Sequence, residues 1–503
     1  MTQTLTLEDD YPTSTGQWNL VVQRASCTQV DIWAGTLFPD LKMPAQARVD
    51  IVASDDSRIS LTINKADWQR PFRDINQRFY CLCQFSGLLP NSHYKVFFYR
   101  LVDGRELVED YWQCLRSASF TTLPAQLPEA DTKPFTIGLG SCFFNHRDGG
   151  QVAGAYKALY ERGPEAVRPD ITLLTGDQVY LDIGFDSLSL LPREIRNRIA
   201  DDYALHWQAL GSMLGAGATW MLPDDHEYWN DFPFYDSPIP ALWALRLPHV
   251  RKQWARTARD GVRNILGTRD IEVLNIGKDL SICLADLRST RSKTQFMTAA
   301  AFEQLIDWAQ KLTCPGVLVI PQLLIDSPDK TECNLLAFAG QYRRLVKALA
   351  VSGNDVVVLS GDVHYGRVAE VALGTKGARL IEVVASPLSN LTGLNGIATS
   401  VARSEPAVFP DPQLINDAEL PPAPVIYNSR YFVSSKLGRL LSAYPRPRTR
   451  EHFMTVSFSR VAETGSVKLS VQAWRVRERD TISNLPVADF AEPYVTDLGV
   501  RVE

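Results

Sequence analysis

Short alternating segments of apolar and polar residues fill the first part of the chain, from Val21 to Thr122. Turn residues separate these segments, and helical periodicity is weak. Alternation with a period of two places every second side chain on one face, so the pattern predicts strands with one buried face. The clearest strand covers residues 94–101 and follows the turn-rich stretch 89–93. Several such strands separated by turns predict a β-sandwich.

A different pattern begins after the linker from Pro124 to Pro134, which is rich in proline, alanine and acidic residues. Apolar runs of strand length now alternate with longer helical patterns, which predicts an α/β layered domain. The predicted strands are residues 135–140, 171–175, 219–222, 281–285, 317–320 and 356–360. The predicted helices are residues 152–161, 299–312 and 341–351. Alternating apolar residues on both sides of the turn at residues 463–466 predict an antiparallel hairpin.

The chain has 503 residues, well beyond the roughly 250–300 at which a single core stops growing, so two domains are expected. The first part resembles an immunoglobulin- or fibronectin-III-like domain, and we assign residues 1–130 to it and residues 131–503 to the α/β domain. The proline-rich stretch 404–447 has little periodicity. We interpret it as a long excursion over the functional face of the second domain.

Polar residues of the types that bind metals follow four of the predicted strands. The carboxyl ends of strands in layered α/β proteins open into one crevice, so groups far apart in the sequence are expected to converge there. Each motif alone is weak, because Gly-Asp is an ordinary turn dipeptide. Together they include two of only seven histidines. The four motifs are Gly140-Ser-Cys142, Gly176-Asp177-Gln-Val-Tyr180, Asp224-Asp-His-Glu227 and Gly361-Asp362-Val-His364.

The order of these motifs, with an Asp-x-Arg at Asp286, resembles the PhoD-like alkaline phosphatases of the calcineurin-like metallophosphoesterase superfamily. The resemblance covers the chain from about Leu139 to Arg367, and the preceding β-domain matches that family's layout. It implies a four-layer metallophosphoesterase-type β-sandwich flanked by helices. It also implies a binuclear centre that hydrolyses phosphate mono- or diesters with a metal-bound hydroxide. Gly-Asp-x-x-Tyr is similar, in addition, to the motif of purple acid phosphatases, in which the tyrosinate binds ferric iron.

The candidate metal ligands divide by donor type. Asp177 is the natural bridging carboxylate, because its two oxygens can hold two cations a few Å apart. Thiolate and phenolate are strong donors that suit a ferric ion, and a hard cation such as calcium or magnesium prefers carboxylate oxygens. The first predicted site is therefore Cys142, Asp177, Tyr180 and His364. The second is Asp177, Asp225 and Asp362.

Three departures from the wider superfamily pattern affect the expected metals. Ser-Cys142 replaces the usual Asp-x-His of the first motif, Asp362 replaces the first histidine of Gly-His-x-His, and Gln322 stands near where a further histidine is expected. The PhoD-like branch shows the same departures. They favour iron and calcium over a di-zinc or di-manganese centre, with magnesium, manganese and zinc as alternatives.

Three further residues are candidates for catalysis. His226 lies between Asp225 and Glu227, a usual arrangement for a histidine that stabilises the transferring phosphoryl group or protonates the leaving alkoxide. Arg288 and Arg291 follow a predicted strand, and an arginine fork matches phosphate oxygens, so either is a candidate substrate clamp. For Arg288, a salt bridge with Asp286 or a neighbouring loop is the alternative.

Composition and charge narrow the partners. The net charge of −5 gives no whole-molecule attraction to nucleic acid or anionic lipid, so we expect a small phosphate-ester substrate and no nucleic-acid partner. Two local basic stretches, 246–263 and 436–450, are interpreted as solvated faces or as the rim of a site for anionic substrates. No apolar run is long enough for a membrane helix. The start of the sequence shows no signal peptide or twin-arginine pair, and the eight scattered cysteines indicate reduced thiols, so a cytoplasmic location is expected.

Two other functions stay open at this stage. Metals and fold do not distinguish classes of phosphate ester, so a phospholipase D-like phosphodiesterase is one alternative. The other is a non-catalytic binding protein on a degenerate phosphatase scaffold, which the presence of every expected ligand type in order disfavours.

Overall fold

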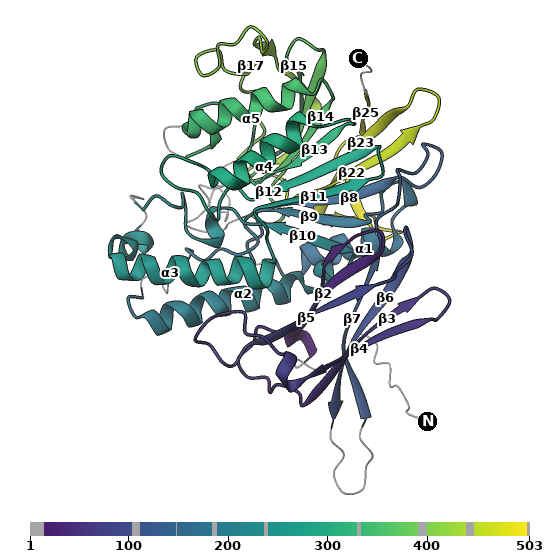
Figure 1. The fold of residues 1–503 in the computed structure, drawn as a ribbon, viewed down its shortest axis with the longest axis vertical. Coiled ribbons are helices and arrows are strands. Elements are labelled where there is room, and N and C mark those ends of the chain that lie inside the picture. The colour runs from purple at the N-terminus through teal and green to yellow at the C-terminus, as the bar shows by residue number, and fades with distance from the viewer. Residues whose placement is uncertain are drawn as a thin grey trace, which may run out of the picture.

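A computed structural model describes residues 15–102, 111–146, 148–183, 189–235, 240–328, 333–390, 400–438 and 447–499. Within these residues the chain forms two antiparallel sheets in its N-terminal part, two seven-stranded sheets in the rest, and two short strand pairs (Figure 1). None of the described helices is both long and apolar enough to cross a lipid bilayer.

The N-terminal part is all β, as its alternating pattern predicts. One sheet has the order β1-β2-β5 and the other the order β4-β3-β6-β7. Trp18 joins the two sheets, because its ring packs edge-on against Phe79 and Phe98. The immunoglobulin-like character of this part and its boundary at residue 130 stay predictions. The strands are β1 (Trp18–Ala25), β2 (Gln29–Thr36), β3 (Gln46–Ala53), β4 (Arg58–Asn64), β5 (Phe79–Ser86), β6 (His93–Val102) and β7 (Tyr111–Thr121).

The first large sheet combines three parallel strands with a C-terminal hairpin. Its order is β10-β9-β8-β22-β23-β24, and β25 also pairs with β23. The predicted hairpin is confirmed as β22 and β23, which pair antiparallel from His452 opposite Arg475 to Val461 opposite Ser466. The strands are β8 (Phe135–Gly140), β9 (Ile171–Thr175), β10 (Ala218–Leu222), β22 (His452–Val461), β23 (Ser466–Arg479), β24 (Pro486–Ala488) and β25 (Tyr494–Leu498).

The second large sheet has the order β11-β12-β13-β14-β16-β15-β19. Its strands β12, β13, β14 and β16 are parallel, so their carboxyl ends lie at the same edge. All six strands predicted for the α/β domain are confirmed to within one residue. The strands of this sheet are β11 (Ile271–Ile276), β12 (Leu280–Ala285), β13 (Gly316–Val319), β14 (Val356–Ser360), β15 (Gly366–Leu373), β16 (Ala378–Ala385) and β19 (Ile426–Phe432).

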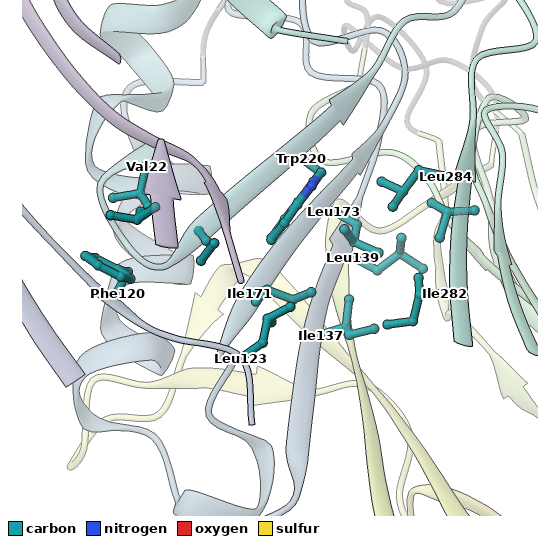
Figure 2. Close-up of a cluster of buried hydrophobic side chains, with 14 of the residues drawn as sticks. Val22, Phe120, Leu123, Ile137, Leu139, Ile171, Leu173, Trp220, Ile282 and Leu284 are labelled. Atoms are coloured by element: carbon teal, nitrogen blue, oxygen red, sulfur yellow. The ribbon is translucent and has the colours of Figure 1, made fainter. Parts of the chain in front are cut away.

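One apolar cluster fills the space between the two large sheets and continues into the N-terminal part. Figure 2 shows Leu139 and Leu173 of the first sheet facing Ile282 and Leu284 of the second. Phe120 of β7 belongs to the same cluster. Removing this much apolar surface from water is the main force that holds the sheets together, at roughly 25 cal/mol for each Å² buried.

The predicted helices are confirmed to within two residues, but the longest helix was not predicted. Helix α2 begins with Pro192, a favoured first helical residue, and buries Ile195, Ile199 and Tyr203 on one face. Helices α4 and α5 pack together over the second sheet (Figure 1). The helices are α1 (Gln151–Arg162), α2 (Pro192–Leu214), α3 (Pro248–Gly261), α4 (Ala299–Gln310) and α5 (Ala339–Val351).

The described part of the stretch 404–447 is more regular than its sequence indicates. It contains β17 (Val408–Phe409), β18 (Ala423–Pro424), β20 (Ser435–Lys436) and the seven-residue β19, which extends the second sheet beside β15. Most of β19 is exposed, and Ile426 has 60% of its surface accessible. A strand at the edge of a sheet with no buried face lacks the alternation by which strands are predicted, and β19 was missed for this reason.

Arg367 fastens this stretch to the second sheet, and its loss is expected to destabilise the fold. Its buried guanidinium donates to the carbonyls of Arg403, Glu405 and Ile325 and lies 3.7 Å from the buried carboxylate of Glu382. Arg367→Met removes the cationic partner of that carboxylate and leaves it only the main-chain N–H groups of Leu324 and Ile325, so the free energy of unfolding should fall by about 3–5 kcal/mol. Chemical denaturation at pH 8 measures this, because burial raises the pKa of Glu382 to about 7.

The matched control is Arg344→Met, which breaks an exposed ion pair with Glu303 and should leave the unfolding midpoint nearly unchanged. Equal effects of the two substitutions would show that Arg367 does not anchor this region.

Candidate metal centre

The polar motifs meet where the carboxyl ends of strands from both large sheets come together. Cys142 follows β8 and Asp177 follows β9, and the N–H of Cys142 donates to the carbonyl of Gly176 over 3.1 Å. Ser389, beyond the end of β16 in the other sheet, donates its N–H to the carbonyl of Cys142 over 3.1 Å. Main-chain bonds therefore join the loops of the two sheets at this edge.

Four of the six predicted metal ligands have backbone conformations that L-residues avoid. The φ angles of Cys142, Asp177, Asp362 and His364 are 56°, 56°, 70° and 55°. Such conformations persist only where the surrounding structure enforces them, and they are concentrated at functional sites. Gly176 has φ of 108°, and a Cβ there would lie 2.6 Å from the Cβ of Asp224. The glycine is thus required for the loop after β9 to reach the loop after β10.

Four carboxylates converge at this edge. Asp177, Asp224, Asp225 and Asp362 each place one oxygen so that all four lie within 4.8 Å of one another. Three of these side chains are buried and Asp362 is half-buried. Buried carboxylates this close repel one another and have lost their hydration. A cation bound among them would compensate both costs. The donor set therefore fits a hard cation, which prefers oxygen ligands.

Asp224 belongs to this group although the sequence analysis selected only Asp225 as a ligand. Its Oδ2 atom is buried and finds no hydrogen-bond partner in the part of the chain that the structure describes. The Asp-Asp dipeptide was visible in the sequence, but adjacent residues usually point to different sides. The structure places both of their carboxylates in the group because a 3-10 turn, Asp225–Glu227, follows the strand at once.

The softer donors lie beside the carboxylates. The Sγ atom of Cys142 is 3.4 Å from Asp177 Oδ2 and 3.4 Å from the carbonyl oxygen of Asp362. Within the described part of the chain, neither the buried hydroxyl of Tyr180 nor the buried Nδ1 atom of His364 has a hydrogen-bond partner. Buried polar atoms are nearly always bonded, so these two fit the role of metal ligands. Among the described residues, the groups of ligand atoms that all lie within 4.8 Å of one another contain neither Cys142 nor His364.

The pKa values of the four donors predicted for the first site are all shifted in the direction that favours the neutral form. Burial raises the pKa of the Cys142 thiol well above its ordinary value, and Asp177 and Asp362 add to the effect. Burial does the same to the hydroxyl of Tyr180 and to the carboxyl of Asp177. Burial lowers the pKa of His364 to about 4, which keeps the imidazole neutral, as ligation requires. A bound cation favours the deprotonated donors, so metal binding would release protons.

His226 is held by a carboxylate that the sequence analysis did not identify. Its Nδ1 atom lies 2.7 Å from Asp182 Oδ1, and the other oxygen of Asp182 accepts the N–H of Asn230 over 2.8 Å. One imidazole nitrogen of His226 also lies within 4.8 Å of oxygens of Asp177 and Asp225. Burial opposes a charge on His226, but Asp182 and these two carboxylates raise its pKa well above the ordinary value.

Glu227 has a structural part in the group. Its carboxylate accepts the main-chain N–H groups of Asp177, Val179 and Asp224 over 2.9, 3.1 and 2.7 Å. These bonds tie the loop after β9 to the loop after β10. The last residue of the Asp-Asp-His-Glu motif therefore shapes the site and does not face a reacting atom.

The two arginines predicted as substrate clamps are both occupied by protein groups. Arg288 donates from Nε to Asp224 Oδ1 over 2.6 Å and from Nη1 to the carbonyl of Phe232. The salt bridge is thus with Asp224, and Asp286 instead accepts the N–H of Arg288. Arg291 donates to two carbonyls and to Gln322. Both side chains are buried and bond neighbouring acceptors, which does not favour the clamp role, and that role stays a prediction.

The described contacts of the two basic stretches are also with other groups of the protein. Arg251 donates to the carbonyl of Leu245 and lies over the ring of Tyr235. In the other stretch, Lys436 and Arg450 pair with Glu478, and Arg448 pairs with Glu451, whereas residues 439 and 446 lie outside the described residues. The described contacts favour the interpretation of solvated and structural charges.

Comparisons with known proteins agree with this architecture. A solved structure of PhoD aligns with 98% of this chain and 92% of its own chain, with a TM-score of 0.60 and 14% identity. The chain has a PhoD-like fold. At this identity the PhoD likeness concerns the fold alone. No family model matches the sequence, and no curated protein matches it.

Two other matched structures have low scores. A redesigned β-sandwich protein aligns with 21% of this chain and 92% of its own, with 15% identity and a TM-score of 0.15. A glycosyl hydrolase family 2 member from Bacteroides cellulosilyticus aligns with 69% of this chain and 37% of its own, with 8% identity and a TM-score of 0.23. Neither likeness bears on this fold.

Proposed function

We propose that this protein is a metal-dependent phosphoesterase that hydrolyses small phosphate mono- or diesters at a binuclear centre. The observation that supports it most is the group of four close carboxylates beside a thiol and a phenol, at one edge of a PhoD-like fold. The test is hydrolysis of a chromogenic phosphate monoester and diester by metal-replete protein.

The donor types assign the residues to two cations. Cys142, Asp177, Tyr180 and His364 would hold a ferric ion, and Asp177, Asp225 and Asp362 a hard cation such as calcium, with Asp224 beside them. When bound, two cations a few Å apart activate water as a nucleophile and neutralise the charge that develops on the phosphoryl group. The φ angles above 50° at four of these residues keep the donors directed to one place before any cation arrives.

His226 is proposed to carry the proton of the reaction. Asp182 holds Nδ1, so the ring is fixed in orientation and its other nitrogen is available to the leaving oxygen. Phe144 packs edge-on against Tyr180, and the ring centroid of Tyr180 lies 4.3 Å from that of His226. These aromatic contacts limit the access of bulk water to Tyr180 and His226. The protein groups thus position the reacting groups and protonate the leaving oxygen, and no covalent phosphoenzyme is required.

The finer features of the architecture belong to the same proposal. Residues 131–503 would form the four-layer phosphoesterase sandwich, and residues 1–130 an immunoglobulin-like domain packed on it. The continuous apolar cluster from β1 and β7 into the large sheets supports a fixed arrangement of the two. A small anionic ester is the proposed partner, and a phospholipase D-like diesterase remains within the proposal.

Iron bound by phenolate should give the protein a visible colour. Phenolate and thiolate together favour the ferric state, and ligand-to-metal charge transfer then produces an absorption band. Tyr180→Phe removes the phenolate and should abolish or strongly shift that band. Absorption spectra and elemental analysis of both proteins measure this. The matched control is Tyr203→Phe, since Tyr203 is equally buried with an unpartnered hydroxyl but packs beside Phe72. Metal-replete protein that contained only zinc, without a band sensitive to Tyr180→Phe, would refute the iron assignment.

A further inference from the structure

The structure assigns Gln322 and Arg291 a positioning role: Arg291 orients the amide of Gln322, and Gln322 in turn orients the carboxylate of Asp362 for the second cation. This inference rests on the proposed function, because it concerns the cation that Asp362 would hold. The three residues follow neighbouring parallel strands. Arg291 lies beyond β12, Gln322 beyond β13 and Asp362 beyond β14, so they form a row along the edge of the second sheet.

The hydrogen bonds fix which way the amide of Gln322 faces. Arg291 Nη2 lies 2.7 Å from Gln322 Oε1, and Gln322 Nε2 lies 3.2 Å from Asp362 Oδ2. A guanidinium has only donors and a carboxylate only acceptors. The reversed amide would place donor against donor and acceptor against acceptor. The chemistry of the two neighbours therefore determines the orientation.

Arg291 is itself held in place. It is 4% exposed, donates from Nε to the carbonyl of Leu287 over 3.0 Å and from Nη1 to the carbonyl of Cys333 over 3.2 Å, and lies over the ring of Phe338. A buried arginine with these contacts has a single orientation. It can therefore transmit a fixed geometry to Gln322, which is 6% exposed.

The orientation of the amide decides what Gln322 does at the site. A glutamine binds a cation through its amide oxygen, and Arg291 occupies that oxygen. Gln322 is thus a donor to Asp362 and not a ligand of the metal. Hydrogen bonds from such outer residues orient ligating carboxylates, and their loss typically costs metal affinity. Gln322, which stands near where the superfamily pattern leads us to expect a histidine, would have this different role.

The test measures cation binding directly. Gln322→Leu removes both hydrogen bonds at similar volume, and Arg291→Met removes the group that orients the amide. Calorimetric titration of the intact protein with calcium chloride, and separately with magnesium chloride, should show roughly 10–100-fold weaker binding for each variant. The iron absorption band should persist, because Asp362 is assigned to the other cation.

A double variant distinguishes an effect of Arg291 through Gln322 from a nonspecific loss of order at the site. If Arg291 acts through Gln322, adding Arg291→Met to Gln322→Leu should weaken binding by less than about threefold further. Gln341→Leu is the matched control. It removes a buried amide whose described hydrogen bonds are to main-chain groups of Phe296 and Met297, and calcium affinity should not change.

The other possible outcomes would refute either the positioning role or the second cation. Wild-type affinity in Gln322→Leu, fully additive losses in the double variant, or an equal loss in Gln341→Leu would overturn the positioning role while the proposed function stands. A wild-type protein that binds neither calcium nor magnesium would instead refute the second cation, and the inference with it. Thermal unfolding of every variant confirms that the titrated protein is folded.

Discussion

Replacing His226 with alanine is expected to lower turnover by roughly 10²–10⁴ while the metal content stays nearly unchanged, because proton transfer by a positioned histidine contributes that much. The ring is half-buried beside three carboxylates and is fixed by Asp182 over 2.7 Å. Steady-state turnover of a chromogenic ester together with elemental analysis measures the effect. Asp182→Asn should lower turnover too, since it alters the group that orients the ring.

A second histidine, His206, which is buried, supplies the control. The Nδ1–H of His206 donates to the carbonyl of Asp202 over 2.7 Å, and the ring packs edge-on against Phe143. His206→Gln should leave turnover close to that of the wild type. A loss of less than tenfold in His226→Ala with metals intact would remove His226 from catalysis. Loss of a metal ion in that variant would make it a ligand.

Removing the second cation is expected to abolish hydrolysis and leave the iron in place. Asp177, Asp225 and Asp362 offer carboxylate oxygens, which bind calcium or magnesium reversibly, whereas thiolate and phenolate hold a ferric ion far more firmly. A calcium-selective chelator should therefore stop turnover without bleaching the iron band. Calcium added back should restore it, because each cation neutralises a different part of the developing charge. Turnover and the absorption band are recorded in the same sample.

The control for this experiment is Asp362→Asn. Because Asp362 is assigned to the second cation alone, this variant should need more calcium for activity and keep most of the iron band. Full activity after chelation would contradict the assignment. Joint loss of iron and calcium in Asp362→Asn would point to one centre with shared ligands.

The strands that hold the site were predictable because of where they lie. β8, β9, β10 and β14 are buried on both faces, and such strands read as continuous apolar runs that end where the polar motifs begin. Helix α2 was missed although its apolar spacing was present, and β19 was missed because it has no buried face. A strand that is buried on both faces is what the sequence records most clearly.

The candidate site was only partly predictable for a different reason. Motifs locate loops, but they do not say which of two adjacent side chains turns inward or which partner a buried arginine finds. Asp224 and Asp182 became visible only through contacts with residues 64 and 44 positions away. The same holds for Arg288 and Arg291, whose forks match phosphate in principle and bond carboxylate, amide and carbonyl oxygens in the fold.

Hydrolysis of p-nitrophenyl phosphate and bis(p-nitrophenyl) phosphate by the purified protein is the measurement that decides whether it is a metal-dependent phosphoesterase. The protein would be assayed metal-free and after addition of iron with calcium, and separately with magnesium, manganese or zinc. We expect hydrolysis of at least one of the two esters, absent from the metal-free protein and highest with iron and calcium together. Failure of the folded, metal-loaded protein to hydrolyse either ester, or hydrolysis that did not depend on metal, would contradict it.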